Sequence, residues 1–200
     1  MKKETIYLII LILVILIVGG YLLFFYKKPA KPSFIFPKKV ATPTEITLPP
    51  PSGITNLGKI QKFEAKRFQS GDFTSEYLLV YKEGLKPKTK LYMPYDGYVF
   101  YDEKQGNPNV NLQIRTKDNS KIIGILGPLK GLCQVTKKES NEKNKVTRYY
   151  CDDVKKGALI AEVSEEIQKI DKEIALNIHG YVNYKDDINF LYENLPLIFK

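Results

Sequence analysis

Few residues in this chain have side chains suited to catalysis or metal binding. Its 200 residues include one histidine, His179, and two cysteines, Cys133 and Cys151. Zinc hydrolases generally hold their metal through two or three imidazoles, and a His-based triad needs a histidine beside its nucleophile. The composition therefore excludes most zinc hydrolase sites and every such triad not built on His179. A lone histidine is more often structural than a ligand, so His179 by itself predicts no site.

The two cysteines are expected to form a disulfide. Residues 134–150 between them are charged and turn-prone, which is typical of an exposed hairpin. A bridge across its base would close a loop of about 18 residues and contribute roughly 3 kcal/mol. A disulfide also indicates an oxidising side of the membrane. Two buried, reduced cysteines are the alternative, and a zinc site from Cys133, Cys151 and His179 lacks the usual C-x-x-C spacing.

Other motifs give no cofactor or catalytic centre. The chain has no phosphate-binding glycine loop and no G-x-S-x-G nucleophile elbow. We therefore expect no metal and no other cofactor. A run of tyrosines could instead form a surface for glycan stacking or partner binding, unless alternate members fill the core. Its members are Tyr92, Tyr95, Tyr98 and Tyr101.

Residues 6–26 predict a single membrane span. The run IYLIILILVILIVGGYLLFFY carries no charge and would extend about 31 Å as a helix, close to the thickness of a bilayer core. A cleaved signal peptide would have a shorter apolar run and a small-residue cleavage site. We expect an uncleaved anchor in the cytoplasmic membrane, with residues 1–5 in the cytoplasm. Lysines flank the span on both sides, so charge does not fix its orientation, and the expected disulfide is the reason to place the C-terminal domain outside.

The charge of the chain is concentrated near this span. The formal net charge is +9; residues 1–57 hold seven lysines and two glutamates, a net of +5, which leaves +4 for the rest. A basic nucleic-acid-binding domain is therefore not expected. Residues 27–57 contain seven of the twelve prolines and predict an extended linker with a reach of up to about 90 Å.

Residues 58–200 predict a mainly β extracytoplasmic domain with one short helix. In the run 110–115 the apolar residues Val110, Leu112 and Ile114 alternate with polar ones, as in a strand with one buried face. Short runs at intervals of about ten residues favour a sandwich or barrel. Residues 163–174 have helical spacing instead, with Val163, Ile167, Ile170 and Ile174 apolar. The other predicted strands cover 91–103, 120–126, 146–150 and 158–163.

The order of these motifs resembles a known group of folds. Residues 93–99, MPYDGYV, are similar to an aP-x-dG-x-V segment, and residues 154–161, VKKGALIA, to V-k-x-G-q-x-I-g. Both segments occur in barrel-sandwich and duplicated-hybrid-motif folds. These folds are shared by lysostaphin/LytM-type zinc endopeptidases, which cut peptidoglycan, and by the biotinyl/lipoyl-type domains of membrane-fusion adaptors. Residues 71–77, 123–126 and 173–178 lie where the peptidase family has its metal and catalytic motifs.

The resemblance implies a peptidase-like domain that has lost its metal site. The three zinc-ligand positions fall on Phe73, Tyr77 and Ala175, and the two catalytic histidines on Ile125 and Glu173. Without imidazole ligands, no zinc-bound water can form near neutral pH. Together with the predicted anchor, the resemblance implies an inactive, membrane-anchored domain that binds the cell wall or regulates an envelope hydrolase or division partner. The alternatives are an adaptor of a secretion or efflux system and an active endopeptidase with an unrecognised site.

Overall fold

The computed structural model describes residues 42–169 and 173–200. The predicted span at 6–26 and the first part of the predicted linker, residues 27–41, lie outside these residues. Within the described residues, none of the helices has the length and the apolar character needed to cross a bilayer.

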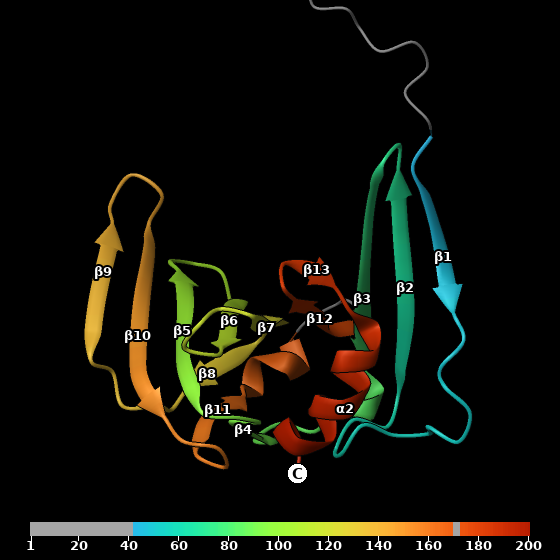
Figure 1. The fold of residues 1–200 in the computed structure, drawn as a ribbon. Coiled ribbons are helices and arrows are strands. Elements are labelled where there is room, and N and C mark those ends of the chain that lie inside the picture. Colours follow the sequence, from blue (N-terminus) through green and yellow to red (C-terminus); the bar gives the residue numbers. More distant parts are fainter. Residues whose placement is uncertain (1–41, 170–172) are drawn as a thin grey trace, which may run out of the picture. The chain divides into compact units, whose positions relative to one another are not determined.

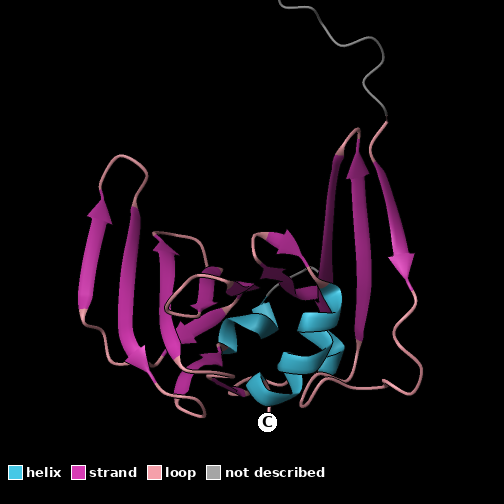
Figure 2. Cartoon of the chain, in the orientation of Figure 1, coloured by secondary structure: helices cyan, strands magenta, loops and turns pink. Residues whose placement is uncertain are grey.

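The described chain is mainly β, as predicted, and its largest element is one antiparallel sheet (Figures 1 and 2). Nine strands follow the order β1-β2-β3-β12-β7-β6-β5-β10-β9, and a tenth, β13, pairs with β12. The bounds are β1 Thr44–Leu48, β2 Phe63–Ser70, β3 Phe73–Tyr81, β5 Gly97–Lys104, β6 Val110–Arg115, β7 Lys121–Gly127, β9 Lys137–Asn141, β10 Val146–Val154, β12 Ile174–Val182 and β13 Lys185–Asp186.

A small sheet and three helical segments complete the domain. The small sheet has the order β4-β11-β8, with β4 at Lys90–Tyr92, β8 at Leu129–Gly131 and β11 at Leu159–Val163. Two 3-10 helices, η1 and η2, span Lys82–Gly84 and Glu165–Lys169, and the α-helix α2 spans Ile188–Ile198. Helix α2 packs on β12, β3 and β4, so it joins the two sheets.

The core lies on one face of the large sheet. Val110, Leu112 and Ile114 are buried and alternate with partly exposed neighbours, which confirms the predicted strand face. The same face carries Ile123 and Ile178, both fully buried. Apolar side chains from the small sheet and from α2 join them in one cluster. The opposite face of the large sheet is therefore left available to solvent at its centre.

The helix predicted at 163–174 is not formed. Val163 ends β11, where it pairs with Leu129, and Ile174 begins β12, where it pairs with Tyr81. Only the 3-10 turn η2 lies between them among the described residues. Ile167 is buried there, so the apolar spacing reflects core contacts made by three separate elements.

Part of the predicted linker belongs to the domain. Residues 44–48 form β1, which pairs with β2 along its whole length, so the prediction of an unpaired linker does not hold there. Leu57 is 1% exposed, and its N–H donates to the Ile60 carbonyl at 2.9 Å. Four of the five residues of β1 are apolar or β-branched, but the prolines at positions 43, 49, 50 and 51 that flank them indicate an extended linker.

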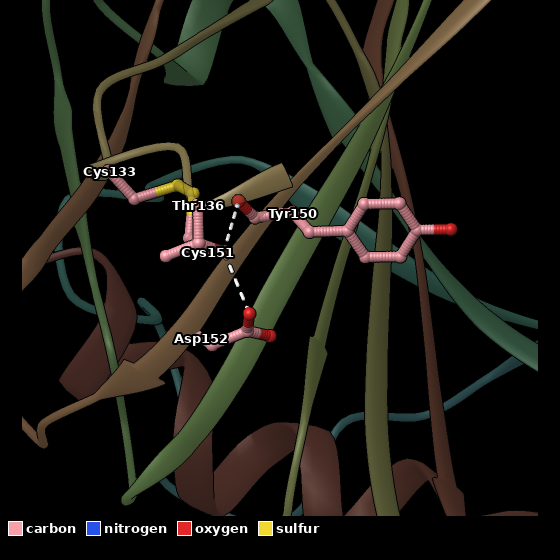
Figure 3. Close-up of a disulfide and its surroundings, with 5 residues drawn as sticks. All are labelled: Cys133, Thr136, Tyr150, Cys151 and Asp152. Atoms are coloured by element: carbon pink, nitrogen blue, oxygen red, sulfur yellow. Dashed lines mark hydrogen bonds between the residues drawn. A yellow bond between two sulfur atoms is a disulfide. The ribbon is translucent and has the colours of Figure 1, made fainter. Parts of the chain in front are cut away.

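The cysteine pair and its hairpin are as predicted. Cys133 and Cys151 form a disulfide with their Cα atoms 6.1 Å apart, and β9 and β10 form the hairpin between them. Beside the bridge, the Thr136 N–H donates to the Tyr150 carbonyl at 2.8 Å, and its hydroxyl donates to Asp152 Oδ2 at 2.7 Å (Figure 3). These contacts tie the start of the hairpin to β10.

Candidate functional site

A groove of about 430 Å³ lies on the face of the large sheet that points away from the core. Three adjacent strands, β6, β7 and β12, form it. Cross-strand pairing places their outward residues side by side: Gln113 opposite Gly124, and Gly124 opposite His179. We call it the β6–β7–β12 groove, and its lining residues are Asn111, Gln113, Arg115, Ile122, Gly124, Leu126, Asn177, His179 and Tyr181.

Gly124 leaves the middle of this groove open. A Cβ atom built at Gly124 would meet no atom within 4 Å. Its two neighbours in register, Gln113 and His179, are polar. An occupant could therefore reach the backbone of β7 while contacting side chains on both sides.

His179 is held in a stack of aromatic rings beside this opening. The centroid of its ring lies 5.3 Å from that of Tyr77 and 6.1 Å from that of Tyr181, the latter with nearly parallel planes. Burial lowers the pKa of His179 below its ordinary value of 6.5 because a charged imidazole would lose its hydration. The side chain is thus neutral near pH 7, with one nitrogen able to donate and the other able to accept.

Two buried polar atoms of the groove lack a partner. His179 Nδ1 and Asn177 Oδ1 make no hydrogen bond with the described residues. A buried polar atom left in this state costs about 1–3 kcal/mol. A ligand with a suitably placed N–H or hydroxyl group would offset that cost, which makes these two atoms the strongest indication of binding.

Arg115 adds a positive charge at one end of the groove. Its guanidinium donates to Gln113 Oε1 at 2.6 and 3.1 Å and to Asn119 Oδ1 at 3.2 Å. It also lies 4.9 Å from the centroid of the Phe100 ring. All these partners are neutral, whereas Arg148, which contacts the same ring, is paired with Asp102 through two hydrogen bonds. Arg115 is therefore held in place with its charge uncompensated by a carboxylate of the described chain.

A larger hollow is less suited to binding. About 710 Å³ lies between the β5–β6 and β9–β10 turns, mostly among exposed polar side chains such as Lys104 and Glu142. None of the buried unpaired polar atoms of the described residues lies in its lining. We therefore take the β6–β7–β12 groove as the candidate site.

The five positions matched to the peptidase site are not brought together. Tyr77 lies beside the groove against His179, but Ile125 is paired with Ile178 on the opposite, core face and is fully buried. Ala175 is also buried and Glu173 is exposed. Phe73, the first residue of β3, is 60% exposed. Because strand register puts Tyr77 and Ile125 on opposite faces, these positions do not line one cleft.

The four tyrosines do not form one surface either. Tyr101 is only 6% exposed and stacks on Tyr149. Tyr95 packs on Phe190, and burial raises the pKa of its hydroxyl. Tyr98 donates to Asn119, whereas Tyr92 lies apart from these, under the ammonium group of Lys200. Tyr101 thus fills the core, which is the alternative that the sequence left open for alternate members of this run.

Sequence reasoning missed most of the groove. Asn111, Gln113 and Arg115 are the polar residues of an alternating strand, and such residues normally face solvent. Their meeting with Asn177 and His179 depends on the pairing of β7 with both β6 and β12, which the sequence does not state. Among the described residues, no group of three or more His, Cys, Asp or Glu side chains is placed to hold a metal ion.

Comparisons of the chain with protein-family models, with curated proteins and with solved structures found no match.

Proposed function

We propose that this protein is a membrane-anchored, non-catalytic binding domain of the cell envelope, and that the β6–β7–β12 groove holds its ligand. The observation that carries the proposal is the pair of buried, unpaired atoms, Asn177 Oδ1 and His179 Nδ1, beside the open Gly124. The predicted anchor at 6–26 and the Cys133–Cys151 disulfide support an extracytoplasmic position for the domain.

The groove chemistry favours the peptide or amino-sugar part of peptidoglycan. Asn177 Oδ1 can accept from an amide N–H, Arg115 can meet a carboxylate, and Asn111 and Gln113 can bind hydroxyl or carbonyl groups. A largely apolar groove with several polar side chains and an aromatic wall is suited to such a ligand. The resemblance to peptidase-like barrel-sandwich or duplicated-hybrid-motif folds supplies the envelope context only, because its five site positions lie apart.

Filling the groove tests this proposal. Gly124→Leu places a side chain into open space, and the backbone there needs no glycine conformation. In the full-length protein, kept in a nonionic detergent, this substitution should weaken co-sedimentation with purified peptidoglycan about tenfold or more, equivalent to roughly 1.4 kcal/mol. Gln69→Leu, an exposed position on β2 outside the groove, is the matched control and should sediment like the wild type.

Three outcomes would count against it. Wild-type protein that fails to sediment with peptidoglycan would remove the proposed ligand. Equal binding by Gly124→Leu and the wild type would place the contact elsewhere. Release of soluble wall fragments by the wild type, lost on addition of a chelator, would show that the protein is an enzyme.

A further inference from the structure

A second hollow, distinct from the β6–β7–β12 groove, is surrounded by lysines. It has a volume of about 490 Å³ and is formed by the segment before β2, the η1–β4 connection, β4 and the last residue of the chain. Glu83, the one acidic residue in the part of its lining that the structure describes, is in an ion pair with Lys62. We call it the lysine pocket, after Lys59, Lys86, Lys88, Lys90 and Lys200.

Most of these charges are not compensated within the described chain. No described carboxylate forms an ion pair with Lys59, Lys86 or Lys90. Lys200 lies 5.6 Å from the centroid of the Tyr92 ring, which is neutral, and Lys88 is 3.0 Å from Glu165 in a pair that is about 70% exposed on both sides. Exposed pairs of this kind contribute little, so the hollow carries an excess of positive charge on exposed side chains.

Lys88 occupies a backbone position that favours glycine. Pro87 and Lys88 are the central residues of a turn that is closed by the Thr89 N–H, which donates to the Lys86 carbonyl at 3.3 Å. The φ of Lys88 is 61°, as at the third position of a type II turn, where glycine or asparagine is usual. A lysine there is strained, and its side chain makes only the exposed ion pair with Glu165 among the described residues.

We propose that the lysine pocket binds a ligand carrying two or more phosphate groups. Several ammonium groups around one hollow attract a ligand with several negative charges more strongly than a ligand with a single carboxylate. Lysine is a point-charge binder of phosphate, and none of the described lining residues is an arginine, whose fork suits planar carboxylates. Such phosphates occur in soluble polyanions and in the headgroups of anionic lipids, and both sources share this chemistry.

The test uses the full-length protein in a nonionic detergent. Isothermal titration calorimetry with sodium tripolyphosphate should show binding. The double substitution Lys86→Gln/Lys90→Gln should raise the Kd about tenfold or more. Lys104→Gln/Lys143→Gln removes the same net charge at two exposed positions outside the pocket and should change the Kd less than about twofold.

A single substitution separates binding from folding. Lys88→Gly removes a pocket charge while relieving the left-handed backbone, so it should weaken binding without lowering the melting temperature. A parallel titration with detergent micelles containing phosphatidylglycerol, against micelles containing phosphatidylcholine, distinguishes the lipid source from the soluble one. If the wild type binds neither tripolyphosphate nor phosphatidylglycerol, the proposal is overturned. Equal weakening by the two double substitutions would also overturn it.

Discussion

At the scale of single residues, the buried His179 links the groove to pH. Its folded-state pKa lies below 6.5, so below about pH 6.5 the unfolded chain binds more protons than the folded one. Stability contributed by the neutral ring is therefore complete above that pH and is lost as the pH falls toward the folded pKa. We expect wild-type protein to lose more free energy of unfolding between about pH 7.5 and 5.5 than His179→Phe, measured by urea denaturation.

The substitution to phenylalanine keeps a ring between Tyr77 and Tyr181 and removes the titration. Carboxyl groups such as Asp186, whose pKa is raised by burial, titrate in both proteins and cancel in the comparison. Identical losses in the two proteins would mean that His179 is not held neutral.

Residue roles were predictable only where a single strand decides them. The alternation at 110–115 is enough to bury Val110 and Leu112. The tyrosine run is different, because a spacing of three on a strand alternates faces: Tyr98 is half-buried on one side of β5, and Tyr101 is in the core on the other. The groove residues lie on different strands, so their meeting depends on pairing register.

At the scale of elements, helix α2 depends on its N-cap. The Asp187 carboxylate accepts a hydrogen bond from the Phe190 N–H at 2.9 Å, which satisfies one of the free donors in the first turn. We expect Asp187→Ala to lower the free energy of unfolding by about 1 kcal/mol, measured by urea denaturation. Asn189→Ala, an exposed position in the same turn, should change it by less than about 0.5 kcal/mol. If both substitutions lower the free energy of unfolding equally, Asp187 does not act as an N-cap.

Helix α2 is difficult to predict from the sequence because of a proline. Phe190, Leu191, Leu195 and Ile198 are buried by α2 at helical spacing, but Pro196 lies inside it and is usually a sign that a helix has ended. Proline in the last turn removes only one N–H, so the packed apolar face outweighs it. Residues 163–174 show the opposite case: their apolar spacing predicts a helix, but Val163 and Ile174 pair in strands.

The disulfide is the second element-scale feature open to test. It joins Cys151, which is fully buried, to Cys133 across a separation of 18 residues. The chain-entropy model gives about 3 kcal/mol for a loop of this size. We expect the double substitution Cys133→Ser/Cys151→Ser to lower the free energy of unfolding by about that amount, and added reductant to lower it in the wild type only. A wild type insensitive to reductant would show that the bridge does not stabilise the fold.

At the scale of the whole molecule, the number and spacing of short apolar runs were enough to predict a mainly β domain, but not where it begins. The predicted boundary at residue 58 falls after β1 and Leu57. Edge strand β1 is exposed along most of its length, so it carries little of the apolar signal that marks a domain. Its place is fixed by the backbone pairing with β2, which a single segment does not reveal.

Truncation separates the contributions of β1 and Leu57. A fragment of residues 49–200 loses β1 but keeps Leu57, whereas a fragment of residues 58–200 loses both. Because burying a leucine contributes about 1.5–3 kcal/mol, the shorter fragment should be less stable than the longer one by roughly that amount, measured by urea denaturation. Removing β1 costs less apolar burial, since four of its five residues are exposed.

Loss of β1 should promote association between chains rather than lower the free energy of unfolding strongly. It leaves the backbone N–H and C=O groups of β2 unpaired along a long edge, and such an edge pairs with other chains. Fragment 49–200 should therefore form dimers or larger species at concentrations where fragment 42–200 is monomeric, measured by analytical ultracentrifugation. Prolines at positions 43, 49, 50 and 51 flank β1 and cannot donate to a neighbouring strand, so the intact edge is protected. If both fragments sediment as monomers, β1 has no such protective role, and its pairing with β2 only extends the sheet by one strand.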